Sequence, residues 1–526
     1  MKSKQGFIKG ALILGISGVI ARFLGLFFRW PVTMLIGDEG IGLYQLSYPL
    51  YMFIISIMSG FPIAISSMVS ERAALGKKEQ AYEVFKISLV ILLIIGTVSS
   101  FGLYIFTPYI IKALKWRSDV YYSIVAIAFA PIFISIMDAY RGYFQGLQMM
   151  VMPAASQIVE QLGRVIVGVA AAYLLLPYGI SYSAAGASFG ACAGAIFGVI
   201  LLTMGYIKNK QYIVPRPKSK GSKGSSTINE RKRDIIKSLL SSAIPISIGM
   251  TVGTIMSLID SLIVPAQLLN AGFNQKVATE LYGQLTGKAH VLINVPLALS
   301  TALSTSIVPA MSEVKALRSI DKIGNRSQTS MKLAMVLGLP SSVGLFILAD
   351  PILCLIFPGR SEGSDILRIL SLSIIFIVLT QIFTAILQGV GEYIAPVKNL
   401  AIGALFKLVL SYILTGIPMF NIKGAAVSSI IGYGIAAILN FNVIKRKIYF
   451  PFDIDKMLLR PLFATLAMGI CVYFMYNKFM NITKSNGIST IVSVVSGIAL
   501  YLILLIGMRI ISKEEASGYI LHRRKR

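Results

Sequence analysis

Apolar windows of about 20 residues recur along almost the whole chain, and each is long enough to cross a hydrocarbon core about 30 Å thick. Only 13% of the 526 residues are charged, which is about half the share in ordinary soluble proteins. Residues 90–96 and 498–508 are apolar throughout, whereas the strands of a membrane barrel alternate between polar and apolar residues. The sequence therefore predicts an all-α integral membrane protein.

The windows predict 14 transmembrane helices. Their ranges are 8–36, 41–69, 84–108, 118–140, 153–176, 183–206, 238–265, 282–311, 332–357, 366–389, 397–417, 424–444, 457–477 and 486–508. An even number of spans returns both termini to the same side. Most of the 49 Lys and Arg residues fall in the segments on that side, which identifies it as cytoplasmic by the positive-inside rule.

One long polar stretch, 207–237, divides the chain near its middle and has the composition of a flexible basic linker. It separates a predicted N-terminal lobe at 1–206 from a C-terminal lobe at 238–444, and 445–526 holds two further spans and a basic tail. The net charge of +27 favours attraction to anionic membrane lipids. We expect no nucleic-acid binding, because no soluble domain with interleaved aromatic residues carries the charge.

An internal repeat relates the two lobes. Gln145-Gly146 and Pro153 recur 243 residues later as Gln388-Gly389 and Pro396, and Ser70-Glu71 recurs as Ser312-Glu313. Gly186 and Gly194 recur as Gly424 and Gly432. Because six spans is an even number, the two lobes have the same orientation and predict a parallel repeat around a central cavity, with the last two spans outside it.

Charged residues inside the predicted spans indicate function, because the bilayer penalises them. The set comprises Arg22, Arg29, Glu160, Arg164, Asp260, Lys288 and Lys407. Arg22 and Arg29 are two helical turns apart and share a face, and Glu160 and Arg164 are spaced to form an ion pair. Asp138 and Arg141, at the end of the fourth span, are expected to snorkel or to cap the helix. Since cations dominate, we expect an anionic solute, and a lipid pyrophosphate would suit Arg22, Arg29 and Lys288.

Several kinds of chemistry lack a sequence signature here. The chain has no GxxxxGK[ST], HExxH or GxSxG string, and Cys192, Cys354 and Cys471 lie far apart without metal-ligand spacing. We therefore predict a protein that is not an enzyme and uses neither a cofactor nor a metal. An inside-negative membrane potential, worth about 2.3 kcal/mol per charge per 100 mV, would favour outward movement of an anion without ATP.

Two strings resemble a known family: GDEGIGLY at 37–44 and RGYFQG at 141–146. They are similar to the polysaccharide-type flippases of the multidrug/oligosaccharidyl-lipid/polysaccharide exporter superfamily, and most of all to its Gram-positive lipid II flippase and stage V sporulation protein B group. The resemblance implies two six-helix lobes around a cationic cavity, alternating access, and transport of an undecaprenyl-pyrophosphate-linked saccharide across a bacterial plasma membrane. It also implies that Arg22 and Arg29 contact the pyrophosphate, with Lys288 near the family's cationic position in the eighth span.

Other readings stay open at this point. Lipid II is the best single substrate, but another lipid-linked sporulation or surface polysaccharide unit fits equally well. A cation-coupled drug exporter would use carboxylates such as Glu160 and Asp260, and a membrane scaffold would recruit cell-wall enzymes through the basic linker. Asp38 and Glu39 are expected either to form a polar external turn or to act in gating, and Arg164 either to bind substrate or to form only a structural ion pair.

Overall fold

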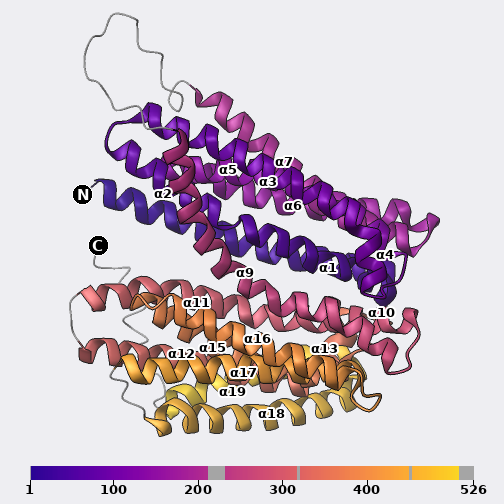
Figure 1. Cartoon of the computed structure of the whole chain (residues 1–526). Helices are drawn as coiled ribbons and strands as arrows, with labels where there is room; N and C mark the ends of the chain where they lie inside the picture. Colours follow the sequence, from indigo (N-terminus) through magenta and orange to yellow (C-terminus); the bar gives the residue numbers. More distant parts are fainter. Residues whose placement is uncertain (1, 211–231, 317–319, 449–452, 509–526) are drawn as a thin grey trace, which may run out of the picture. The chain divides into compact units, whose positions relative to one another are not determined.

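The computed structural model describes residues 2–210, 232–316, 320–448 and 453–508 (Figure 1). Within these ranges every regular element is a helix, and the chain forms two compact units. The first unit comprises Met1–Ala266 and Asn274–Gly283, and the second comprises Gln267–Phe273 and Gln284–Arg526. Most of the predicted linker, at 211–231, and the tail at 509–526 lie outside the described residues.

The first unit contains the helices of the N-terminal half and two that follow the linker. They are α1 (Lys2–Met58), α2 (Gly60–Ala74), α3 (Lys78–Ala113), α4 (Val120–Ala128), α5 (Ala130–Gly146), α6 (Val151–Leu175), the short 3-10 helix η1 (Leu176–Tyr178), α7 (Ile180–Lys208), α9 (Lys232–Asn270) up to Ala266, and α10 (Gln275–Gly283). Most of α9 belongs to this unit, so the compact units divide at a different place from the predicted lobes. The lobe boundaries at 206 and 238 stay a prediction.

The second unit contains the end of α9 from Gln267 and all the helices from Gln284 onwards. They are η2 (Gln284–Ala289), α11 (His290–Ala316), α12 (Ile320–Ile347), α13 (Ala349–Ile356), α14 (Ser364–Ser371), α15 (Ser373–Gly389), α16 (Ile394–Thr415), α17 (Asn421–Lys447), the π-helical turn η3 (Asp455–Leu459), α18 (Arg460–Thr483) and α19 (Asn486–Gly507). The helices α18 and α19 pack against each other, and Tyr501 of α19 donates a hydrogen bond to the carbonyl of Val336 in α12 at 3.1 Å.

Among the described residues, 13 helical segments are long and apolar enough to cross a membrane. The first of them, Phe23–Ala74, has 52 residues, and at 1.5 Å per residue it is about twice as long as one crossing requires. Gly37 breaks it with a φ of 67°, a conformation that glycine adopts without steric cost. This segment therefore accommodates the first two predicted spans, and the predicted all-α membrane fold is confirmed.

Two details of the predicted spans differ from the structure. Asp38 and Glu39 are helical, so the break at the predicted external turn is confined to Gly37. The second span is interrupted between Met58 and Gly60, where the Gly60 amide donates to the Ser247 hydroxyl at 3.1 Å. A Cβ on Gly60 would lie 2.3 Å from the Ala243 carbonyl oxygen, so only glycine permits this close approach to α9.

The backbone repeats at the end of α5 and of α15. The amides of Leu147, Gln148 and Met149 donate to the carbonyls of Tyr143, Gln145 and Phe144, and those of Val390, Gly391 and Glu392 donate to Ile386, Gln388 and Leu387. Each donor and each acceptor of the second set lies 243 positions after its counterpart. Both turns place one residue in the left-handed region, Gln148 at φ 61° and Gly391 at φ 87°. The predicted internal repeat is thus present in the hydrogen bonds of both turns.

Glycine contacts repeat in the same way. A Cβ on Gly146 would lie 2.6 Å from the Cβ of Val69, and a Cβ on Gly389 would lie 2.4 Å from the Cβ of Met311. Gly194 of α7 faces the backbone of α6, and Gly432 of α17 faces the backbone of α16. The small residues predicted from the sequence therefore serve close helix packing at equivalent positions of both repeats.

Candidate functional site

Three tyrosines on α1 form the wall of the candidate site. Tyr44, Tyr48 and Tyr51 follow the i, i+4, i+7 spacing that places side chains on one helix face. The ring centroids of Tyr44 and Tyr48 are 5.6 Å apart, and those of Tyr48 and Tyr51 are 5.7 Å apart. This face of α1 therefore carries three phenol rings in a row. The hydroxyls of Tyr48 and Tyr51 accept hydrogen bonds from an arginine on another helix.

Arg164 of α6 is that arginine. Its Nη1 donates to the Tyr48 hydroxyl at 3.2 Å and its Nη2 donates to the Tyr51 hydroxyl at 3.3 Å. The residue is only 8% exposed, and its buried Nε has no hydrogen-bond partner among the described residues. A buried donor without a partner costs about 1–3 kcal/mol, so an anion that accepted this hydrogen bond would remove that cost.

Arg29 of α1 lies over the same aromatic ring as Arg164. Its guanidinium carbon is 6.0 Å from the centroid of Tyr48, and that of Arg164 is 5.9 Å from it. Two cations that share one ring repel each other, and the negative face of the ring partly offsets the repulsion. The structure therefore brings two of the four predicted substrate-binding residues together in one unit.

The charge of Arg164 is balanced by a carboxylate that it shares with Arg141 of α5. The pair expected between Glu160 and Arg164 is present at 3.7 Å, but Arg141 binds Glu160 more closely, with Nη2 at 2.9 Å from Oε2. Arg141 also donates to the Ser156 hydroxyl at 2.9 Å and lies 4.0 Å from Asp138. The expectation that Asp138 and Arg141 snorkel or cap is therefore wrong, because the partners of Arg141 lie on the neighbouring helix α6.

We call Arg29, Tyr48, Tyr51, Arg141, Glu160 and Arg164 the arginine–tyrosine cluster. It offers guanidinium and phenol N–H and O–H donors next to a single well-bound carboxylate, so its chemistry suits an oxyanion such as phosphate. Sequence reasoning missed the tyrosines, although their helical spacing was visible, and it missed Arg141 as the partner of Glu160. The pairing across two helices had no signal in the sequence.

Lys288 occupies a different environment from the one expected of a substrate ligand. It lies in the π-helical turn η2 and is fully buried. Its Nζ donates to the Arg360 carbonyl at 2.6 Å and lies 3.5 Å from a carboxylate oxygen of Glu362, and it is 5.8 Å from the centre of the Phe357 ring. The amine thus holds the segment between α13 and α14 within the second unit.

Glu39 joins three segments of the first unit just after the Gly37 break. It forms ion pairs with Arg117, in the segment between α3 and α4, and with Lys276 of α10 at 3.5 Å. Arg117 also pairs with Asp119. Burial opposes the charge of Arg117, but the hydrogen bond to Glu39 and the charge of Asp119 outweigh it and raise the pKa of Arg117 above its ordinary value.

Asp38 lies where α1 meets α10 at very short range. A Cβ on Gly283 would lie 2.3 Å from the Asp38 carbonyl oxygen, and a Cβ on Gly42 would lie 2.1 Å from the Thr279 carbonyl oxygen. The hydroxyl of Tyr282 donates to the Gln45 carbonyl at 3.4 Å. The GDEGIGLY string is therefore a packing surface for α10, with glycines where the backbones touch.

The two remaining predicted site residues are not placed in the arginine–tyrosine cluster. Asp260 of α9 is 1% exposed and lies in the first unit. The side chain of Arg22 lies outside the described residues, although its backbone continues α1.

Comparison with known proteins identifies the family to which this chain belongs. The family model of the polysaccharide biosynthesis protein matches residues 7–315, which is more than half of the chain. The chain belongs to this family. The match covers every residue of the arginine–tyrosine cluster as well as the GDEGIGLY string, and a second family model, MatE, matches residues 288–413.

Two curated relatives align with this chain over most of their length. Stage V sporulation protein B of Bacillus subtilis (strain 168) is 28% identical over 98% of this chain and 97% of its own. Lipid II flippase MurJ of the same organism is 28% identical over 90% of this chain and 88% of its own. A solved structure of lipid II flippase MurJ, in an inward closed conformation, matches with a TM-score of 0.69 and 18% identity, covering 95% of this chain and 99% of that one. The chain is thus a multi-pass membrane protein with the fold of these transporters.

Proposed function

We propose that this protein is a flippase that moves an undecaprenyl-pyrophosphate-linked saccharide from the inner to the outer leaflet of a bacterial plasma membrane by alternating access. Its termini lie in the cytoplasm, and it acts without enzymatic chemistry. The observation that carries this proposal is that Arg29 and Arg164 both lie over the Tyr48 ring, while the buried Nε of Arg164 has no hydrogen-bond partner in the part of the chain that the structure describes. Lipid II is the substrate that we favour.

The chemistry of a pyrophosphate fits this cluster. Guanidinium groups stay charged when desolvated and offer several N–H donors to phosphate oxygens. Glu160 neutralises only part of the cationic charge, because it is shared between Arg141 and Arg164. Arg22 is proposed to extend the cationic surface along α1, and Lys288 is proposed as a cation of the second repeat that would first have to leave the Arg360 carbonyl.

Gating is proposed for the contact between the GDEGIGLY string and α10. Alternating access requires a contact that forms and parts in each cycle, and contacts between glycine backbones lose little side-chain packing when they part. The ion pairs of Glu39 with Arg117 and Lys276 would hold the closed form, with Asp38 at the contact itself. Glu160 and Asp260 are proposed as the carboxylates that would bind a coupling ion.

The relative from sporulation suggests a second candidate substrate. The sporulation protein and the MurJ flippase of Bacillus subtilis are equally identical to this chain, at 28% each. Another lipid-linked polysaccharide unit, used in sporulation or at the cell surface, is therefore the alternative. Cell-wall synthesis enzymes are proposed as partners in either case.

The test is complementation of a bacterium depleted of its lipid II flippase, scored by lipid II exposed on the outer leaflet. We expect the wild-type protein to restore exposure and the Arg29→Ala protein to fail at equal membrane abundance. Lys478→Ala is the matched control, because this exposed lysine lies on α18, outside the repeats, and should leave rescue unchanged.

Each failure of this test has a distinct meaning. An inserted wild-type protein that does not rescue would reject lipid II and redirect the assay to other lipid-linked saccharides. Full rescue by Arg29→Ala would reject the cationic site and favour a scaffold role. Export of organic cations that depends on Glu160 but not on Arg29 would favour a drug exporter.

A further inference from the structure

The first four turns of α9 pack against the first unit along one narrow stripe. Ile235, Leu239, Ala243 and Ser247 are buried, and they recur every fourth residue. Gly60 closes the stripe against Ala243 and Ser247. Most of the remaining surface of these turns is exposed, although the helix belongs to a membrane-spanning segment.

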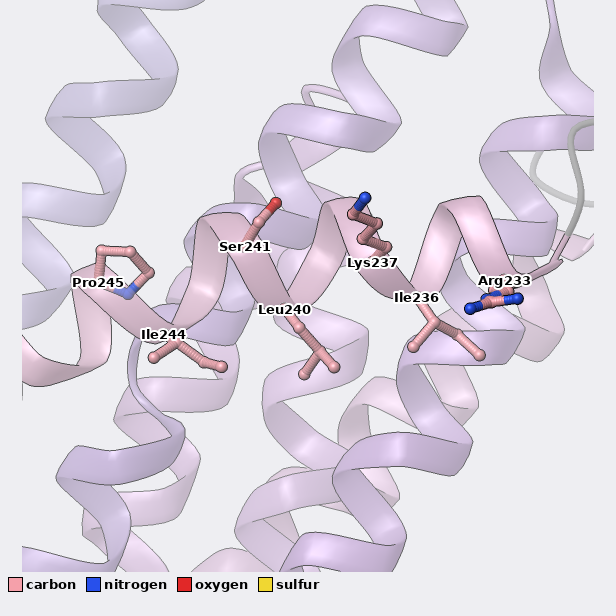
Figure 2. Close-up of a pocket in the computed structure, with 7 residues that line it drawn as sticks. All are labelled: Arg233, Ile236, Lys237, Leu240, Ser241, Ile244 and Pro245. Atoms are coloured by element: carbon pink, nitrogen blue, oxygen red, sulfur yellow. The ribbon is translucent and has the colours of Figure 1, made fainter.

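Two parallel rows of side chains lie on that exposed surface. One row is polar, Arg233, Lys237 and Ser241, and the other is apolar, Ile236, Leu240 and Ile244. Both rows follow the i, i+4 spacing of neighbours on a helix. Together with Pro245 they line a surface groove of about 590 Å³. In Figure 2, Lys237 and Ser241 point to the upper side of the helix, and Ile236, Leu240 and Ile244 point to the lower side.

The cations of the polar row are available to a ligand. Among the described residues, neither Arg233 nor Lys237 forms an ion pair or a hydrogen bond. The Ser241 hydroxyl donates to the Ser238 carbonyl at 3.0 Å, which leaves its oxygen free to accept a hydrogen bond. The two rows run side by side along the helix, and the lining residues from Arg233 to Pro245 span about 18 Å of its axis at 1.5 Å per residue.

We infer that this groove binds one anionic phospholipid of the leaflet on the linker side, with its headgroup phosphate at Arg233 and Lys237. One acyl chain follows the row Ile236, Leu240 and Ile244. The cytoplasmic leaflet supplies anionic lipid, and each basic residue near it adds attraction. This inference does not depend on which saccharide the protein moves.

Charge complementarity excludes the nearest competing occupant. The chain's own segment 211–231 carries Arg216, Lys218, Lys220, Lys223 and Arg231 against the single acidic residue Glu230. Such a segment repels Arg233 and Lys237. A soluble phosphate would satisfy the two cations but would leave the apolar row uncovered, whereas a phospholipid matches both rows at once.

The test is native mass spectrometry of the full-length protein in detergent, titrated with dioleoyl phosphatidylglycerol or dioleoyl phosphatidylcholine. We expect the double variant Arg233→Gln/Lys237→Gln to bind the first phosphatidylglycerol about tenfold more weakly or worse. Binding of phosphatidylcholine should not change. Ile244→Ser should weaken phosphatidylglycerol binding, and this variant should still not prefer phosphatidylcholine.

The matched control is Lys77→Gln/Lys78→Gln, which removes two exposed lysines at the start of α3, on the same predicted side of the membrane. Equal loss of phosphatidylglycerol binding in this control, or no loss in the Arg233/Lys237 variant, would overturn the inference. Millimolar inorganic phosphate that displaced the lipid completely would overturn it in favour of a phosphate-ion site. An equal loss of phosphatidylcholine binding would show that the groove does not select anionic lipid.

Discussion

The two repeats place a buried cation at the same position and surround it differently. Arg164 lies on α6 facing Gly194 of α7, and Lys407, 243 residues later, lies on α16 facing Gly432 of α17. The residue one turn earlier is Glu160 in the first repeat and Gly403 in the second. A Cβ on Gly403 would lie 2.4 Å from the Gly432 carbonyl oxygen, so the second repeat has no space for a carboxylate there.

The difference extends to the polar groups next to each cation. In the first repeat, Glu160 binds Arg141 and Arg164, and Arg164 reaches the tyrosine hydroxyls. In the second repeat, neutral amides join α16 and α17, the counterparts of α6 and α7, with Asn399 donating to Asn440 at 2.8 Å. The repeats therefore share a packing scaffold, and we expect the charged network that suits an anion to belong to the first of them.

The strongest test of this asymmetry compares Arg164→Gln with Lys407→Gln. A hydrogen bond between a charged donor and an anionic substrate is worth up to about 3 kcal/mol, and a rise of that size in the transport barrier slows flipping about a hundredfold. We expect Arg164→Gln to lose that much in initial rate, measured in proteoliposomes per folded protein, and Lys407→Gln to lose less than about tenfold. Arg141 still balances Glu160 in the first variant, so the protein should fold.

Similar losses in the two variants would contradict this comparison, because they would give the two cations the same role. Tyr48→Phe sharpens the result. It removes one hydroxyl that binds Arg164 but keeps the ring under both guanidinium groups. Its rate should fall less than that of Arg164→Gln.

The sequence predicted more of the helix scaffold than of the charged network. The spans and the repeat followed from apolar length and from glycines at fixed offsets, which are local signals. The partners of Arg141 and Lys288 could not be predicted from local signals. Arg141 forms its ion pair with Glu160 on another helix, and Lys288 binds a carbonyl 72 residues away in the sequence. The environment of Lys288 also depends on a π-helical turn, in which side chains point in other directions than they would in a continuous α-helix.

The second test concerns the packing that the repeats share. A Cβ on Gly194 would lie 2.4 Å from the Glu160 carbonyl, and one on Gly432 would lie 2.9 Å from the Gly403 carbonyl. Gly194→Val and Gly432→Val should each destabilise the protein by about 2 kcal/mol through overpacking, measured as a lower midpoint of thermal unfolding. Gly102→Val is the control, since nothing lies within 4 Å of its Cβ position.

A large difference between the two valine variants would break the equivalence of the scaffolds. If only Gly194→Val unfolded at a lower temperature, α16 and α17 would be able to move apart around the valine, which the close contacts of Gly432 do not indicate. Equal effects with an unchanged Gly102→Val protein would confirm that close packing is common to both repeats and that only the charges differ.

The smallest expected effect exchanges the residues at the two equivalent turns. Gln148 holds a left-handed conformation at φ 61°, and Gly391 holds its counterpart at φ 87°. Left-handed backbone costs a non-glycine residue about 1 kcal/mol, and that cost is absent for glycine. Gln148→Gly should therefore stabilise the protein by a few tenths of a kcal/mol up to about 1 kcal/mol, and Gly391→Gln should destabilise it by a little more.

The extra cost at Gly391 comes from its neighbour, because a Cβ there would lie 2.7 Å from the Lys315 amine, which is the flexible end of a side chain and can move. Gln148→Ala is the control: it removes the same side chain and keeps the left-handed strain, so its stability should stay near that of the wild type. If Gln148→Ala stabilised the protein as much as Gln148→Gly, the gain would come from the lost side chain. The two turns would then share hydrogen bonds but not the backbone strain that makes them equivalent.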